Sequence, residues 1–142
     1  MYNLDSYGSH LGWLQLYVNA HPDFEAALRP HFRAADLYYQ TIATVVPYAD
    51  HFPFAAAGVA SVFHHRVNCR SGRFFHHRPD DDVSRVSANV LARDVSVVAT
   101  WLEEMSLVDT LPFTSGIPDA QRPEVAACWE DLFGGWTGQT TT

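Results

Sequence analysis

Residues 13–28 read WLQLYVNAHPDFEAAL and place a strand directly before a helix. Residues 13–18 are aromatic and aliphatic, a composition that is typical of strands. Pro22 and Asp23 favour the start of a helix, and apolar residues then follow at helical spacing. Pro30 is expected to kink or end this helix. A strand followed closely by a helix is the repeating unit of an α/β fold.

The same alternation continues on both sides of this stretch. Residues 2–5 are expected to start a strand, residues 37–46 to be extended and residues 59–63 to form a buried strand. Ser87 is expected to cap a long helix. Its apolar residues recur at steps of four and three and form one stripe that we expect to be buried: Leu91, Val95, Val98, Leu102 and Met105. The pattern predicts an α/β fold, and 142 residues suffice for about one domain.

The composition excludes several classes of function. All nine basic residues are Arg, so the chain has neither a Schiff-base Lys nor the Lys of a phosphate-binding loop. A formal net charge of −7 disfavours nucleic acid as a partner, because phosphate backbones are bound by basic surfaces. Neither a membrane-spanning run nor a signal peptide is found, and the compartment stays open. Cys69 and Cys128 form no C-x-x-C motif, and whether they pair also stays open.

Three polar groups are expected at the carboxyl ends of strands, where loops of α/β sheets bind ligands. Asp5 ends the first strand, Asp50 lies in the aromatic turn of residues 48–54, and His76 and His77 precede a Pro-Asp-Asp turn. Carboxylates and imidazoles are both zinc ligands. Each group also has a structural explanation. Asp5 suits a turn, Asp50 a helix cap, and the histidine pair a solvated loop.

Three further groups of polar and charged residues are weaker candidates for a functional site. His64 and His65 end the strand predicted for residues 59–63, and alternation turns one of them into the core. Glu103 and Glu104 lie on the outward face of the long helix and are interpreted as solvent-exposed. The arginines near the histidine loop either attract an acidic group of a ligand or balance the acidic body. They are Arg66, Arg70, Arg73 and Arg78.

Short motifs occur in an order that resembles a known family. They are Asn3-Leu4-Asp5, then Asp50-His51-x-Pro53-Phe54, then His77-x-Pro79-Asp80-Asp81 before the amphipathic helix. Together they resemble the last part of the co-catalytic zinc aminopeptidases, a family that includes bacterial secreted aminopeptidases and the related glutaminyl cyclases and glutamate carboxypeptidases. The resemblance covers residues 1–106. Residues 107–142 are interpreted as a C-terminal extension with a short amphipathic helix and a frayed end.

The resemblance implies a sheet-centred exopeptidase fold with two zinc ions. Asp5 matches the family's ligand of one ion, and His77 matches the ligand of the other. By its position directly before His77, His76 is the residue that the resemblance implies to polarise the substrate carbonyl. Asp50 matches a carboxylate near the site that orders ligands or substrate. Asp81 lies where it could accept the second N–H of a histidine ligand.

The family's bridging Asp and general base have no counterpart here, because both precede the Asn-Leu-Asp strand in the family. The resemblance therefore implies the C-terminal part of a zinc-dependent aminopeptidase-like hydrolase, which cleaves peptide bonds at a free N-terminus. We expect an incomplete sheet, no tight zinc binding by this chain alone, and activity on a peptide substrate only after completion by an N-terminal segment or a partner chain. The alternative is a non-catalytic interaction module that binds a partner through its sheet edge or through the C-terminal helix with Trp129 and Phe133.

Overall fold

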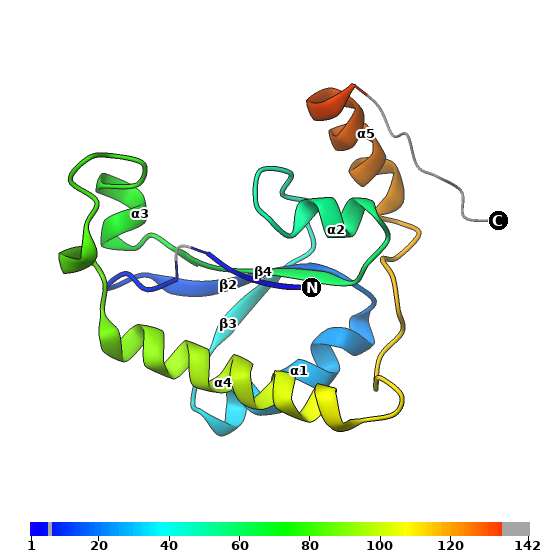
Figure 1. The fold of residues 1–142 in the computed structure, drawn as a ribbon, viewed down its shortest axis with the longest axis horizontal. Helices are drawn as coiled ribbons and strands as arrows, with labels where there is room; N and C mark the ends of the chain where they lie inside the picture. Colours follow the sequence, from blue (N-terminus) through cyan, green and yellow to red (C-terminus); the bar gives the residue numbers. More distant parts are fainter. Residues whose placement is uncertain (6, 135–142) are drawn as a thin grey trace.

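The computed structural model describes residues 1–5 and 7–134 and contains a mixed sheet with helices on both faces (Figure 1). The elements in chain order are β1 (Tyr2–Leu4), β2 (Trp13–Asn19), α1 (Pro22–Ala34), β3 (Tyr39–Ile42), α2 (Phe52–Ala56), β4 (Ser61–Val67), α3 (Arg70–Phe74), a 3-10 turn (Val83–Arg85), α4 (Ala88–Leu107) and α5 (Arg122–Phe133). The predicted α/β class is confirmed.

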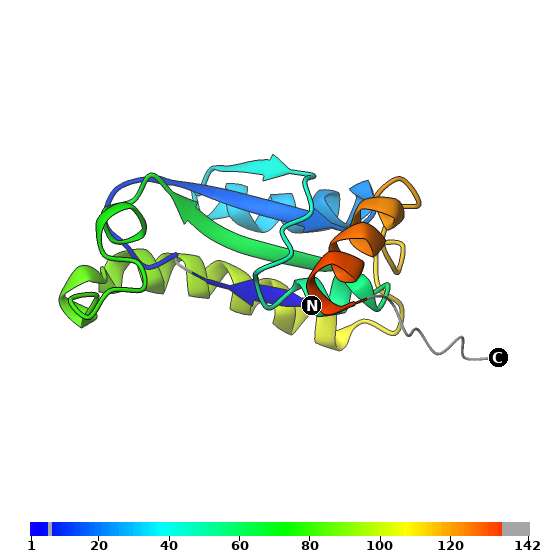
Figure 2. The same cartoon turned by 90° about the horizontal axis from the view of Figure 1, so that it is seen from above.

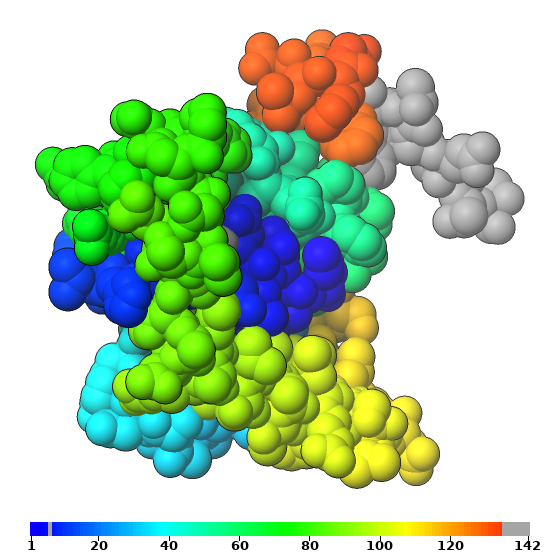
Figure 3. All heavy atoms as spheres, turned by 60° about the vertical axis from the view of Figure 1, so that its left-hand side comes forward, coloured from blue at the N-terminus to red at the C-terminus, as the bar shows by residue number. Residues whose placement is uncertain are grey.

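The sheet has four strands in the order β1-β4-β2-β3. β1 runs parallel to β4 and β2 runs parallel to β3, whereas β2 and β4 are antiparallel. Within the described residues, β1 and β3 each pair on one side only, so both are edge strands. The first residues of the chain, dark blue in Figure 3, lie at the surface between α2 and α4. The outer edge of β1 is therefore accessible in the described part of the chain.

Helices α1 and α4 cover one face of the sheet (Figures 1 and 2). Side chains alternate along β2, so Leu14, Leu16 and Val18 all point to this face. They form the main core together with side chains of both helices, among them Phe24, Leu28, Phe32, Val97, Val98 and Trp101. Burial of these apolar groups is the main driving force for folding.

Helix α1 continues beyond Pro30 to Ala34, so of the two expected effects of this proline, a kink or an end, the end is wrong. Phe24, Leu28 and Phe32 follow at steps of four and are buried on both sides of the proline. Packing of Phe32 against the sheet holds the last turn in place, although Pro30 removes one backbone hydrogen bond. Tertiary packing decides the length of this helix.

Helix α4 buries a face that differs in part from the predicted stripe. Val98 is buried as expected, but Val95 is 41% exposed and Leu102 is 46% exposed. The helix turns Asp94 and Trp101 toward the sheet instead. Trp101 brings a larger aromatic side chain into the core than any single member of the stripe, and Asp94 contacts Arg66 and His64 there. The expectation that all five stripe residues are buried is therefore wrong.

Three local predictions concern the ends of elements. β4 extends to Val67, so His64 and His65 lie inside the strand and not at its end. The prediction that Asp50 caps α2 is wrong, because His51 occupies that position and its side chain makes no capping bond. Ser87 caps α4 as predicted, with its Oγ accepting the N–H of Val90 at 3.3 Å. Between β4 and the histidine pair, residues 70–74 form the short helix α3.

Residues 108–134 return to the body of the fold. Ile117 and Val125 pack in a second core against buried side chains from α2 and the segment before it, namely Val45, Phe52, Ala55 and Ala56. Asp23 of α1 accepts the N–H and the hydroxyl of Thr114, at 2.8 and 2.6 Å. The described part of the predicted extension thus packs on residues 1–106. The frayed end predicted for residues 137–142 lies outside the described residues.

The structure answers one open question about side-chain chemistry and tests one prediction. Cys69 and Cys128 are free thiols and do not pair. Glu103 and Glu104 are exposed on α4 as predicted, and Glu104 lies 3.3 Å from the imidazole of His31. Among residues 1–5 and 7–134, no helix combines the length and apolar content that a bilayer crossing requires.

Candidate functional site

Asp5 lies directly after β1, at the carboxyl end of an edge strand. Its N–H donates to the carbonyl oxygen of His64 at 3.1 Å, which continues the pairing between β1 and β4 by one residue. Its side chain lines a cavity of about 380 Å³, and His65 and His76 line the same cavity. A carboxylate from one strand and two imidazoles from elsewhere in the chain therefore surround one space.

His65 belongs to this group, although its sequence context gave it less weight. Alternation along β4 turns His64 toward α4 and His65 toward the opposite face, where Asp5 is. Burial is the main cause that lowers the pKa of His65, and the nearby Asp5 opposes the shift. The Nδ1 atom of His65 is buried and has no hydrogen-bond partner among the described residues. Correct boundaries for β4 would have identified this orientation.

His76 and His77 lie in the turn that follows α3. The N–H of Arg78 donates to the carbonyl oxygen of Phe75 at 2.9 Å and closes the turn. The two imidazole rings are stacked with their centroids 3.8 Å apart. His76 lines the cavity beside Asp5. His77 has φ of 59°, a left-handed conformation that is unusual for a residue other than glycine.

The two supporting carboxylates predicted from the sequence occupy different surroundings. Asp50 is exposed, and the two residues before it, Tyr48 and Ala49, line the cavity. Asp81 lines a neighbouring cavity of about 130 Å³ together with His76. Asp81 therefore shares a cavity with His76, whereas the expected histidine ligand, His77, does not line that cavity.

A buried network holds the loop that follows Asp5. Arg66 of β4 donates to the carbonyl oxygens of Tyr7 at 3.1 Å and Gly12 at 3.2 Å. Its guanidinium also lies 3.6 Å from the carboxylate of Asp94, which is fully buried on α4. His64 contacts the same carboxylate oxygen at 3.3 Å. Arg66 thus ties both ends of the loop over residues 7–12 to the sheet.

Asp94 was not among the predicted residues, although the sequence contains a signal for it. Asp94 lies three residues after Leu91 and four before Val98, on a face that otherwise carries apolar residues. A carboxylate in such a position needs a buried partner, because an isolated charge in a core is costly. Arg66 supplies it, and this contact shows that at least one arginine of the predicted basic group has a structural role.

The carboxylate and imidazole groups around Asp5 are suitable zinc ligands, but there are too few of them for a complete site. Carboxylate oxygen and imidazole nitrogen are both common zinc ligands, and closed zinc sites require four ligands. Among the residues that the structure describes, no three His, Cys, Asp or Glu side chains are arranged to hold a metal ion. The described residues therefore provide part of a zinc site at most, and further ligands would have to come from outside them.

Comparisons of the chain with protein-family models, with curated proteins and with solved structures find no match.

Proposed function

We propose that this chain is the C-terminal part of a zinc-dependent aminopeptidase-like hydrolase, with Asp5 and His77 as ligands of its two zinc ions. The observation that supports this most strongly is the cavity at the end of β1. It brings together Asp5, which belongs to one motif of the resemblance, and His76, which directly precedes another motif far away in the sequence. His77 stacks directly on His76.

The described residues would supply only some of the groups that such a hydrolase needs. Zinc would supply Lewis-acid polarisation of the peptide carbonyl and of the attacking water. Asp5 offers a hard oxygen ligand fixed by the strand before it, and His77 offers a nitrogen ligand fixed by its turn. His76 lines the cavity and would donate a hydrogen bond to the carbonyl of a bound peptide. The general base and the bridging carboxylate belong to an N-terminal segment or a partner chain.

The cavity also supports a substrate class. Tyr17, Tyr48 and Phe63 contribute aromatic side chains to the lining of the cavity that Asp5 also lines. An apolar side chain at the N-terminus of a peptide would be buried against these rings, because removing apolar area from water is favourable. The proposed substrate is therefore a peptide with an apolar or aromatic first residue.

The open edge of β1 supports completion by further structure. An edge strand exposes unpaired backbone N–H and C=O groups and can accept a neighbouring strand. β1 pairs only with β4 among the described residues, and it ends at Leu4, directly before Asp5. Strands added there would place their own ligands beside Asp5.

The test uses the native protein that contains this segment, purified from its source cells. We expect this protein to hydrolyse phenylalanine p-nitroanilide. Loss of a residue that supports a metal ligand lowers activity by roughly 10–100-fold. Loss of a ligand itself, in His77→Ala or Asp5→Asn, should therefore lower kcat/KM by a factor of about 100 or more. Glu103→Gln is the matched control, because this carboxylate is exposed on α4. Near-normal turnover by His77→Ala would refute its assignment as a ligand.

A second candidate is a non-catalytic interaction module. The exposed apolar side chains on α5, Leu132 and Phe133, favour this function. Trp129 is less available than predicted, because it packs against Phe52 of α2 with ring centroids 6.0 Å apart. Such a module would form a stable complex whose affinity does not change when zinc is removed by a chelator, whereas the hydrolase would lose activity.

A further inference from the structure

The cavity beside Asp5 adjoins a second cavity between the end of β4 and α3. This second space, the arginine cavity, has a volume of about 350 Å³ and is lined by residues 65–69, 72, 73 and 76. His65 and His76 line both cavities, so the two spaces are neighbours. We propose that the arginine cavity binds a carboxylate of the peptide substrate, carried by the residue that follows the scissile bond. This assignment rests on the proposed function and adds the chemistry of the leaving residue.

The charged side chains that line the arginine cavity are cationic. Arg66 and Arg73 contribute guanidinium groups, and no Asp or Glu is among the described residues that line it. The chain as a whole has a formal net charge of −7, so this cavity reverses the sign of the overall charge. Clefts lined by one sign of charge concentrate ions of the opposite sign. The arginine cavity therefore favours an anionic group.

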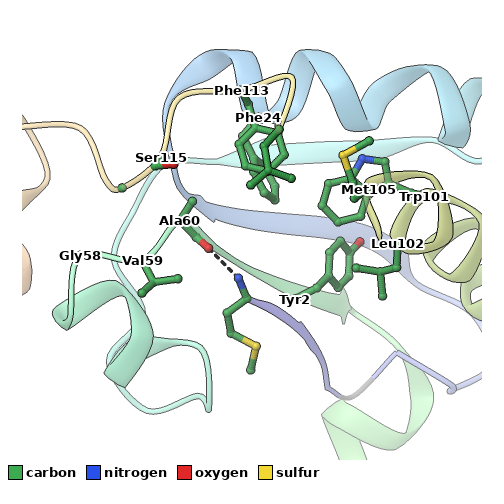
Figure 4. Close-up of a pocket in the computed structure, with 13 residues that line it drawn as sticks. Tyr2, Phe24, Gly58, Val59, Ala60, Trp101, Leu102, Met105, Phe113 and Ser115 are labelled. Atoms are coloured by element: carbon green, nitrogen blue, oxygen red, sulfur yellow. Dashed lines mark hydrogen bonds between the residues drawn. The ribbon is translucent and has the colours of Figure 1, made fainter. Parts of the chain in front are cut away.

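The cavity on the α4 face of the sheet has a different chemistry (Figure 4). It is lined mainly by apolar side chains. The one charged group that lines it among the described residues, the amine of Met1, donates to the carbonyl oxygen of Ala60 at 2.7 Å. An anion in that cavity would lose its hydration beside apolar walls, which is unfavourable.

Arg73 is the charge that the arginine cavity offers to a ligand. Arg66 is already engaged with the buried carboxylate of Asp94 at 3.6 Å. Arg73 forms no ion pair within the described part of the chain, although the sequence holds 16 Asp and Glu residues. Its guanidinium carbon lies 5.9 Å from the centroid of the Phe74 ring, a contact that orders the group and leaves its charge in place. A guanidinium can hold a carboxylate through two parallel hydrogen bonds.

His76 relates the two cavities to the peptide bond that would be cleaved. In the proposed function, His76 donates to the substrate carbonyl and the first residue of the peptide occupies the cavity with Asp5. A chain that continues past His76 enters the second space that this side chain lines. One residue of extended chain spans only roughly 3.5 Å, so a carboxylate that reaches a neighbouring cavity belongs to the residue directly after the bond.

The first test compares two substrates of the native protein that contains this segment. Phenylalanyl-glycine has a carboxylate on the residue after the bond, and phenylalanyl-glycinamide lacks it. We expect kcat/KM to be about fivefold higher for phenylalanyl-glycine. Arg73→Glu should abolish or reverse this preference. Arg70→Glu makes the same change in charge on the same helix, but Arg70 does not line the cavity, so this variant should keep the preference.

A third substrate, phenylalanyl-aspartic acid α-amide, shows which carboxylate is bound, because it carries the charge on the side chain. Preference for phenylalanyl-glycine indicates a terminal carboxylate, and preference for the third substrate alone indicates an acidic side chain. Both results support the proposal. Equal kcat/KM for all three substrates, or equal effects of Arg73→Glu and Arg70→Glu, would overturn it.

A binding measurement on the 142-residue chain separates this proposal from the proposed function. N-acetylglycine should shift the Nε–H signal of Arg73 in proton–nitrogen NMR spectra with saturation, whereas N-acetylglycinamide should not. The signal is assigned from its absence in Arg73→Glu. Saturable binding without hydrolysis by the native protein would refute the hydrolase and keep the carboxylate site. No shift of the Arg73 signal would overturn the carboxylate site, whether or not the native protein hydrolyses peptides.

Discussion

His51 is a polar residue that is fully buried without hydrogen bonds to its side chain among the described residues. Its exposed fraction is 0%, it stacks on Phe63 with ring centroids 5.3 Å apart, and neither ring nitrogen has a hydrogen-bond partner among the described residues. Burial lowers its pKa from 6.5 to about 4, and the nearby Asp50 opposes this shift only weakly. The imidazole is therefore neutral in the folded protein and acts as a core residue at physiological pH.

This burial predicts a loss of stability in mild acid. The unfolded chain protonates His51 near pH 6.5 and the folded chain only near pH 4, so the unfolded state binds more protons between these values. The free energy of unfolding should therefore fall as the pH drops through this range, by up to about 1.4 kcal/mol per pH unit. Urea titrations at pH 7 and pH 5 measure the difference. His51→Leu should reduce it, whereas the exposed His10→Leu should not. An unchanged difference in His51→Leu would contradict the assignment.

His77 gives a second prediction at the scale of one residue. Its left-handed φ of 59° costs an L-amino acid roughly 1–2 kcal/mol, which glycine avoids. Glycine also loses more conformational entropy on folding, so His77→Gly should leave the free energy of unfolding within about 1 kcal/mol of the original. His77→Val should be clearly less stable, because a β-branched residue is poorly suited to this conformation. Equal urea midpoints for the two variants would show that the turn does not impose this backbone conformation.

At the scale of elements, the contact between α4 and β4 depends on one buried carboxylate. Asp94 is fully buried, and its Oδ2 contacts both Arg66 and His64. The remaining oxygen, Oδ1, has no partner among the described residues. The carboxylate therefore links the helix to the strand and, through Arg66, to the loop that follows Asp5.

Asp94→Asn should lower the free energy of unfolding by about 3 kcal/mol, because it leaves the charge of Arg66 without its buried partner. Amide hydrogen exchange in residues 7–12 should also become faster, since Arg66 bonds to the carbonyls of Tyr7 and Gly12. Asp109→Asn, an exposed carboxylate beyond the end of α4, serves as the control and should change stability by less than about 0.5 kcal/mol. Unchanged exchange in the loop would contradict the link through Arg66.

At the scale of the whole molecule, residues 108–134 are part of the packed fold and not a separate extension. Ile117 is 3% exposed in the second core. Ile117→Ala should lower the free energy of unfolding by about 2–5 kcal/mol within a single cooperative transition. Leu132→Ala, on the exposed side of α5, should change it little. A separate transition at lower denaturant, seen only in Ile117→Ala, would mean that the C-terminal part unfolds independently.

Much of this fold can be predicted from local sequence. Residues 2–5 and 13–18 have a composition that suits strands, and Ser87 has a hydroxyl that can bond to the first turn of a helix. The predictions that were wrong concern features that depend on tertiary contacts. The continuation of α1 past Pro30 and the choice of the buried face of α4 both depend on which side chains pack on the sheet, and spacing alone does not specify this.

The candidate site is predictable to a similar extent. Strand ends and motif order single out Asp5, His76 and His77. Asp5 and His76 line one cavity, whereas His77 is not among the residues that line it. His65 receives less weight because the predicted strand ends too early to give the orientation of its side chain. Asp94 escapes prediction because its partner Arg66 is remote in sequence and becomes its neighbour only when α4 packs on β4.

The zinc content of the native protein, purified from its source cells without chelators, tests the central claim most directly. The proposed hydrolase should contain two zinc ions per molecule, and Asp5→Asn should lose at least one of them while keeping its secondary structure. A folded native protein that contains no zinc, or an Asp5→Asn variant that retains both ions, would contradict the proposal that Asp5 and His77 belong to a zinc peptidase site.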